Sequence, residues 1–171
     1  MNLPTKITIS RLVLIPVFIT LFLIPFPYHQ LIATAVFVVA SLTDWLDGHI
    51  ARKCNMVTTL GKFLDPVADK VLVASALILA TTLEVGIGDK IAIVVCSVVI
   101  IARELIITCF RTIAATKNVI LAADKIGKAK TATQLTGLTF YLSFAEVGEL
   151  NATVGQVFFY IGFVCLMIAT A

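Results

Sequence analysis

Charged residues are scarce in this chain of 171 residues. Only 13% of its residues are Asp, Glu, Lys or Arg, whereas a soluble domain has about a quarter. Hydrophobic residues make up 60%, and the mean hydropathy is +1.05. This composition excludes an ordinary water-soluble protein. It also excludes an intrinsically disordered one, because disorder requires abundant charge and few apolar residues.

Cysteines are few and lie far apart in the sequence. The four are Cys54, Cys96, Cys109 and Cys165, and no two of them form a CxxC pair. Three lie in apolar runs, where a cysteine usually behaves as a small buried apolar residue. The sequence therefore indicates neither a disulfide framework nor a metal–thiolate site.

Long apolar stretches predict an all-α polytopic membrane protein, with one domain over residues 1–171. Each spanning helix needs about 20 residues. No charged residue lies between Leu12 and Thr43, but prolines at 25 and 27 divide this stretch, because proline removes a backbone donor and restricts the residue before it. The six predicted spans cover residues 8–25, 30–52, 64–83, 89–115, 126–145 and 151–171.

Basic residues are distributed unevenly over the two predicted sides of the membrane. If the N-terminus is cytoplasmic, all of the 13 Lys and Arg residues except Lys90 lie on the cytoplasmic side. Loops on that side carry an excess of Lys and Arg in membrane proteins. We therefore expect both termini to lie in the cytoplasm.

Four aspartates lie at the facing ends of the second and third predicted helices. Spacings of three or four residues place Asp44, Asp47, Gly48, Ala51 and Arg52 on one helix face, and Gly61, Asp65 and Asp69 on one face of the next. A short cytoplasmic connection makes the two helices antiparallel, so these faces can meet. Ionisable side chains in spanning segments are costly and face the protein interior or water.

Carboxylates that converge in this way cannot all stay ionised without a compensating charge. Two divalent cations would supply it, and oxygen ligands favour Mg²⁺, Mn²⁺ or Ca²⁺. Such a pair can stabilise the attacking and leaving oxygens of a phosphoryl displacement. Gly48 and Ala51 leave room for a ligand, and Arg52 can bind a phosphate through two N–H groups. Singly, these residues could serve as helix caps, packing residues or membrane anchors.

The pattern Asp44-x2-Asp47-Gly48-x2-Ala51-Arg52-x8-Gly61-x3-Asp65-x3-Asp69 resembles the signature of the CDP-alcohol phosphotransferase family. This resemblance implies a homodimer of six-helix subunits, each with a polar cavity that opens to the cytoplasm. It also implies two Mg²⁺ or Mn²⁺ ions on the four aspartates, with Asp69 as general base as well. The residues that would contact the CDP-lipid are Gly48, Arg52, Thr58 and Gly61.

Five basic residues near the predicted cytoplasmic mouth favour an anionic acceptor. They are Arg103, Arg111, Lys125, Lys128 and Lys130, although the lysines could instead be membrane anchors. The segments 2–11, 65–70, 102–104 and 127–131 are similar to those of bacterial phosphatidylglycerophosphate synthases, a branch of the same family. That similarity implies transfer of a phosphatidyl group from CDP-diacylglycerol to glycerol 3-phosphate in the bacterial inner membrane. Thr8 and Arg11 would then lie near the donor head group.

Other functions compete with this interpretation. An enzyme of the same family could use inositol phosphate, serine or a phosphatidylglycerol as its acceptor. A membrane prenyltransferase would have aspartate-rich motifs in two separate helix pairs. An ion-coupled transporter would place its carboxylates near the membrane midplane and have internal repeats. The sequence has one aspartate cluster, at one membrane face, and no visible repeat.

Overall fold

A computed structural model of the chain describes residues 3–54, 59–116 and 125–170, with side chains for 10–43, 67–110, 113, 127 and 129–170. These residues form the six predicted helices. They are α1 (Leu3–Leu23), α2 (His29–Cys54), α3 (Thr59–Ala80), α4 (Ile87–Thr116), α5 (Lys125–Leu150) and α6 (Ala152–Thr170). The prediction of an all-helical chain with six helices is therefore confirmed for the described residues.

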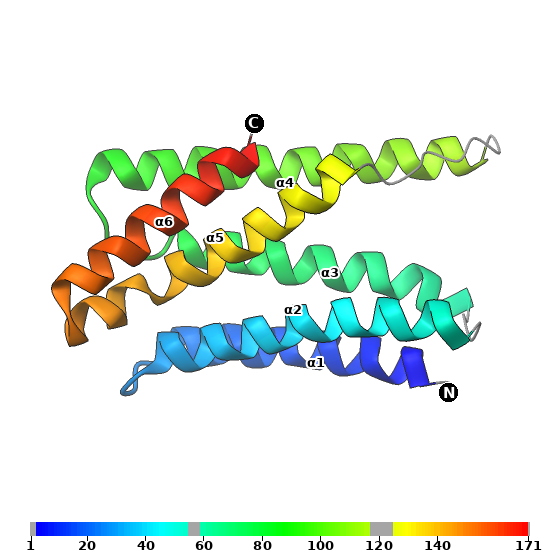
Figure 1. The fold of residues 1–171 in the computed structure, drawn as a ribbon, viewed down its shortest axis with the longest axis horizontal. Coiled ribbons are helices and arrows are strands. Elements are labelled where there is room, and N and C mark those ends of the chain that lie inside the picture. Colours follow the sequence, from blue (N-terminus) through cyan, green and yellow to red (C-terminus); the bar gives the residue numbers. More distant parts are fainter. Residues whose placement is uncertain (1–2, 55–58, 117–124, 171) are drawn as a thin grey trace.

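The helices pack as two hairpins, with α3 and α4 completing the bundle. Figure 1 shows α1, α2 and α3 side by side, the α5–α6 hairpin crossing them obliquely, and α4 along the opposite side. The closest association is between α5 and α6, and α5 also packs against α2 and α3, while α4 touches α3 and α6. This arrangement brings parts of α3, α4 and α5 together near the middle of the molecule.

The proline-rich break lies between α1 and α2, as the sequence predicts. α1 ends at Leu23 and α2 begins at His29. Tyr28 adopts a φ of 61°, in the left-handed region that non-glycine residues seldom occupy. The His29 N–H donates to the Phe26 carbonyl over 3.1 Å. The break is therefore a tight, hydrogen-bonded turn, and it allows α2 to run back along α1.

Aromatic and aliphatic side chains from all six described helices form the core. Phe18 of α1 and Phe37 of α2 are fully buried, and their ring centroids lie 5.6 Å apart. Leu72 of α3 and Tyr141 of α5 belong to the same buried cluster. Burial of such side chains contributes roughly 1.5–3 kcal/mol each, so this core holds α3 and α5 in fixed positions.

Glycines allow the close approach of α5 and α6. A Cβ atom on Gly162 would lie 2.6 Å from the Tyr141 nitrogen, and one on Gly137 would lie 2.9 Å from the Cys165 Cβ. Both distances are shorter than a van der Waals contact, so neither position has room for a side chain. Small residues at such positions let two helix backbones come together, and here they fix the direction of α5.

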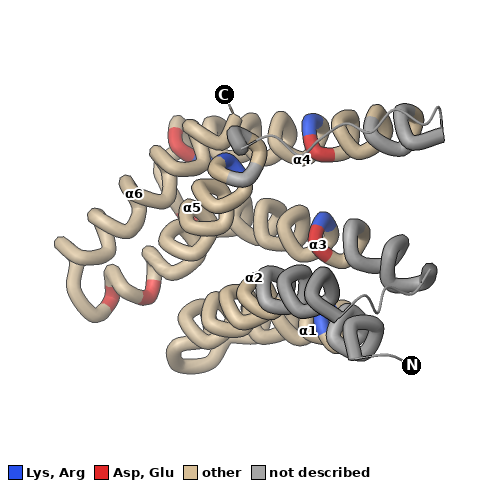
Figure 2. Tube along the Cα trace, turned by 45° about the vertical axis from the view of Figure 1, so that its right-hand side comes forward, with Lys and Arg blue, Asp and Glu red and all other residues tan. Residues whose placement is uncertain are grey.

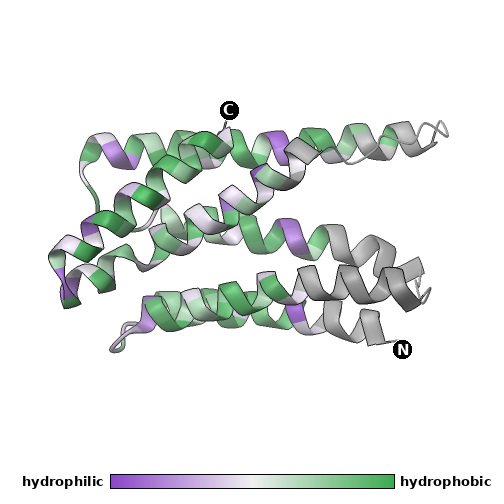
Figure 3. Cartoon of the chain, in the orientation of Figure 1, coloured by the Kyte–Doolittle hydropathy of each residue, from purple (hydrophilic) through white to green (hydrophobic). Residues whose placement is uncertain are grey.

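Large apolar side chains cover the outside of α4 and α6. In the described residues, two segments are long and apolar enough to cross a membrane, Ile87–Phe110 and Ala152–Thr170, and Ser10–Leu23 and His29–Thr43 are shorter apolar segments. Figure 3 shows hydrophobic residues along the outer surfaces of these helices. Exposed examples are Val95 and Val98 on α4, and Val164 and Ile168 on α6. The protein thus has the apolar exterior that a lipid environment requires, and six spanning helices remain a prediction.

Glu146 of α5 joins the end of that helix to the beginning of α2. Its side chain is buried, and Oε2 accepts a hydrogen bond from the Leu31 backbone N–H over 2.8 Å. Oε1 lies 2.9 Å from Nδ1 of His29. The first N–H groups of a helix have no partner within the helix, and a carboxylate is favoured there. Glu146 therefore caps α2 from another helix.

We expect Glu146→Ala to lower the free energy of unfolding by about 1–3 kcal/mol, because it leaves a buried N–H unpaired. Thermal unfolding in detergent would show this as a lower midpoint. Glu149→Ala is the matched control, since Glu149 lies on the same helix and is exposed. Equal midpoints for the two variants would contradict the capping role.

Candidate functional site

A cavity of about 60 Å³ lies where α3, α4 and α5 meet. Its polar lining residues are Asp69 and Lys70 from α3, Glu104 from α4, and Thr131 and Gln134 from α5. Its apolar lining comes from α3 and α4 and includes Leu77 and Ile100. Polar groups from three helices therefore surround a space that is otherwise apolar.

Asp69 contributes its carboxylate from the middle of α3. Its side chain is half-buried. Ala68, just before it in the sequence, is fully buried, whereas Val67 and Val71 are exposed. Lys70 follows Asp69 and also lines the cavity. Figure 2 shows an acidic residue beside a basic one on α3, and a second such pair on α4. Asp69, for which the family resemblance implies a role as general base, thus lines the cavity.

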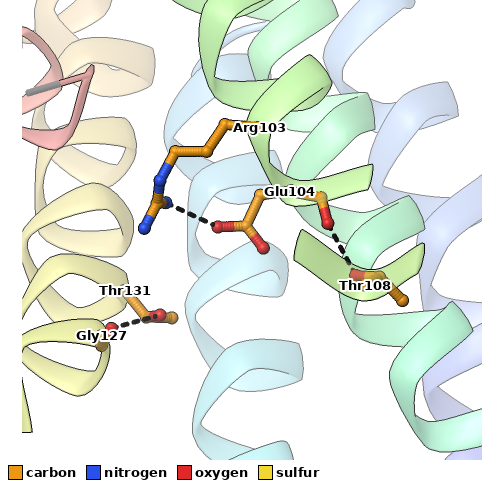
Figure 4. Close-up of polar contacts among 5 residues, drawn as sticks. All are labelled: Arg103, Glu104, Thr108, Gly127 and Thr131. Atoms are coloured by element: carbon orange, nitrogen blue, oxygen red, sulfur yellow. Dashed lines mark hydrogen bonds and ion pairs between the residues drawn. The ribbon is translucent and has the colours of Figure 1, made fainter. Parts of the chain in front are cut away.

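Arg103 and Glu104 form an ion pair on α4. The Arg103 Nη1 lies 3.1 Å from the Glu104 Oε1, and both side chains are about one-third exposed, at 30% and 34%. Figure 4 shows both side chains extending from α4 into the space next to the helix turn that carries Gly127 and Thr131. A partly exposed pair of this kind contributes little to stability. Arg103 can therefore leave Glu104 and bind another anion at a small cost in free energy.

Lys130 of α5 adds a second positive charge at this place. Its charge is repelled by Arg103 and attracted by Glu104. Of the five basic residues that the sequence suggests for an anionic acceptor, Arg103 and Lys130 lie near enough to influence each other's charge, and neither lines the cavity. An anion bound near Glu104 would need both cations, because this carboxylate opposes a negative ligand.

Arg11 lies on α1 and is only 1% exposed. Arginine is almost never fully buried unless it is paired. Arg11 does not line the cavity of α3, α4 and α5, but α1 packs against both α2 and α3. The structure therefore places it inside the helix bundle, on a helix that adjoins the two aspartate-bearing helices.

Most of the other predicted site residues lie outside the described side chains. The backbone places Thr8 in α1, Asp44, Asp47, Gly48 and Arg52 in α2, Gly61 and Asp65 in α3, Arg111 in α4, and Lys125 and Lys128 in α5; Thr58 is outside the described residues. α2 ends at Cys54 and α3 begins at Thr59, so the two aspartate-bearing stretches belong to adjoining, oppositely directed helix ends (Figure 1). In the part of the chain with described side chains, no three His, Cys, Asp or Glu residues could hold a metal ion together.

Four polar residues that line the cavity were not among the predicted site residues, namely Lys70, Glu104, Thr131 and Gln134. Gln134 is the most deeply buried of them. An uncharged amide in an apolar helix carries no signal of its own. The available signal was its spacing, since Gln134 follows Lys130 by four residues and therefore shares its helix face.

Comparison with known proteins supports the resemblance seen in the sequence. The family model described as CDP-alcohol phosphatidyltransferase matches residues 1–168. A Bacillus subtilis protein named CDP-diacylglycerol–glycerol-3-phosphate 3-phosphatidyltransferase is 40% identical, over 82% of this chain and 76% of its own length. A Salmonella typhimurium protein of the same name is also 40% identical, over 82% of this chain and 76% of its own length. A rice protein named cardiolipin synthase (CMP-forming) is also 40% identical, over 84% of this chain and 46% of its own length.

Proposed function

The chain belongs to the CDP-alcohol phosphatidyltransferase family, and we propose that it transfers the phosphatidyl group of CDP-diacylglycerol to glycerol 3-phosphate. The products are phosphatidylglycerophosphate and CMP. The observation that carries this proposal is the 40% identity, over most of the chain, to proteins named for that reaction. Arg103, which is paired with the cavity residue Glu104, and the nearby Lys130 support it, because they suit an acceptor with a phosphate group.

The donor set suits a pair of hard divalent cations. Asp44, Asp47, Asp65 and Asp69 offer only carboxylate oxygens, which favour Mg²⁺ or Mn²⁺, and the one described member is half-buried at the cavity. When bound, these ions would neutralise charge on the donor pyrophosphate and on the departing CMP. Gly48, Arg52, Thr58 and Gly61, together with Thr8 and Arg11, are proposed to hold the CDP-lipid.

Asp69 is proposed to take the proton from the 1-hydroxyl of glycerol 3-phosphate. The freed oxygen attacks the phosphorus that carries the diacylglycerol, a new P–O bond forms, and the bond to the CMP phosphate breaks. CMP leaves with the electron pair of that bond. Arg103 and Lys130 hold the acceptor phosphate, with Arg111, Lys125 and Lys128 as further candidates, so that the hydroxyl is oriented for attack.

The reaction is proposed to take place at a membrane, in a homodimer with the site on the cytoplasmic side. The exposed apolar residues of α4 and α6 support a lipid environment. The concentration of Lys and Arg on one predicted side supports the orientation.

A second acceptor, phosphatidylglycerol, has one specific observation in its favour, the rice relative named cardiolipin synthase (CMP-forming). The two acceptors differ in charge. Glycerol 3-phosphate carries a phosphate monoester, which approaches two negative charges near neutral pH, whereas the phosphodiester of phosphatidylglycerol carries one. A comparison of the two acceptors in one assay therefore separates them.

Purified protein supplied with CDP-diacylglycerol and single acceptors tests the proposal. We expect CMP release with glycerol 3-phosphate and little with serine, inositol phosphate or phosphatidylglycerol. Release with one of these and not with glycerol 3-phosphate would reassign the acceptor. Release with none, in the presence of Mg²⁺ or Mn²⁺, would contradict the family reaction for this chain.

Arg103→Ala should raise the KM for glycerol 3-phosphate by about 10- to 100-fold, because one charge-assisted contact is worth roughly 1.5–3 kcal/mol. The KM for CDP-diacylglycerol should stay unchanged. Steady-state kinetics with each substrate varied in turn would measure both. Lys90→Ala is the control, since Lys90 is exposed near the start of the same helix. A rise confined to the KM of the donor would reassign Arg103 to the donor site.

A further inference from the structure

Gln134 is a buried polar residue in the cavity. Its side chain is 3% exposed, and it lines the space shared with Asp69 and Glu104. No hydrogen bond joins its amide to a group in the described part of the chain. A buried amide that lacks a protein partner is unfavourable unless water or a ligand supplies one. The amide of Gln134 is open to this cavity, so a water molecule or a ligand group can reach it.

The neighbouring polar groups already have partners. The Thr131 hydroxyl donates to the Gly127 carbonyl over 3.1 Å, and Glu104 is paired with Arg103. The amide of Gln134 retains two donors and an acceptor, so it can both give a hydrogen bond to a ligand hydroxyl and accept one from it. A volume of about 60 Å³ holds a few water molecules or part of a small polyol.

Asp69 and Gln134 line the cavity from two helices, and Arg103 is paired with the lining residue Glu104 of a third. Asp69 lies on α3 and Arg103 lies on α4. Lys130 lies on α5, one turn before Gln134 and on the same face of that helix. In the proposed reaction, the 1-hydroxyl of glycerol 3-phosphate meets Asp69 and the phosphate meets the cations. The hydroxyl on the central carbon then has no assigned partner. We propose that Gln134 binds this 2-hydroxyl and so selects glycerol 3-phosphate over acceptors that lack it, an inference that rests on the proposed function.

A substrate analogue without the central hydroxyl tests this directly. The wild-type protein is compared on glycerol 3-phosphate and on 3-hydroxypropyl phosphate, with CDP-diacylglycerol as donor. We expect kcat/KM to be at least about tenfold lower for the analogue, because a site built to bind a hydroxyl rejects a substrate that lacks it. Equal values for the two acceptors would overturn the assignment without any variant.

Gln134→Met then removes the amide while keeping the length of the side chain. We expect it to lower kcat/KM for glycerol 3-phosphate by about tenfold or more and to change the value for the analogue by less than about threefold. Retained turnover of the analogue shows that the variant is folded. Equal losses of kcat/KM on both acceptors would indicate a structural role and overturn the inference. An unchanged preference of the variant for glycerol 3-phosphate over the analogue would overturn it as well. Gln156→Met, at an exposed position on α6, should match the wild type.

The outcomes also separate this inference from the proposed function. If the wild-type protein releases CMP with glycerol 3-phosphate but Gln134→Met keeps its preference, only the role of Gln134 fails. If the wild-type protein releases no CMP with glycerol 3-phosphate, the proposed function fails and the inference fails with it.

Discussion

Asp69→Asn should reduce CMP release by at least about a hundredfold while leaving the protein folded. A positioned general base contributes roughly 10²–10⁴-fold to a rate, and asparagine cannot accept the proton of the acceptor hydroxyl. The same change removes one charge from the proposed metal ligands. The amide has nearly the shape of the carboxylate, and the side chain is only half-buried, so the packing of α3 should persist.

The measurement is the rate of CMP release at saturating donor and acceptor, together with the thermal unfolding midpoint in detergent. Asp89→Asn is the matched control, because Asp89 is exposed in the first turn of α4 and lies outside the cavity of α3, α4 and α5. It should keep wild-type activity. A rate for Asp69→Asn within about threefold of the wild type would exclude Asp69 as the base.

The helices could be predicted from long apolar stretches that contain no charged residue. The residues at which they begin and end could be predicted less closely. Hydropathy marks the part of a helix that suits lipid, whereas a helix continues wherever its backbone can remain hydrogen-bonded. α3 therefore begins at Thr59 rather than at 64, through the polar stretch before its apolar part. α5 continues to Leu150 rather than ending at 145, and the buried Glu146 in its last turns finds its partners on α2.

Of the residues that line the cavity, Asp69 could be picked out by its spacing along one helix, and its role stays a prediction. Asp69 and the pair of Arg103 and Glu104 stand out because charge is costly in an apolar helix, and the structure places Asp69 and Glu104 in one cavity. The cavity itself depends on how α4 and α5 meet α3, which is set by contacts between distant parts of the chain, such as those at Gly162. The burial of Gln134 follows from that packing, and no local pattern reports it.

Chelation of divalent cations should abolish CMP release, and Mg²⁺ or Mn²⁺ should restore it. Neutralising the charge that develops on a phosphoryl group and its leaving group is worth several kcal/mol, which corresponds to a loss of at least about a thousandfold. The assay compares protein treated with EDTA against protein treated with EDTA that is already saturated with Mg²⁺. Activity that survives chelation at near its original rate would exclude a metal-dependent reaction.

Loss of activity on chelation alone does not locate the ions, since a cation could also arrive bound to the donor pyrophosphate. Asp65→Asn separates these two cases. Asp65 lies one helical turn before Asp69 on the same face of α3, so as a ligand it should set the affinity of the protein for the metal. The variant should then need a higher concentration of Mg²⁺ for half-maximal activity, and its KM for glycerol 3-phosphate should change little. A cation carried only by the donor would leave the Mg²⁺ dependence of the variant equal to that of the wild type, and the four aspartates would then need another role.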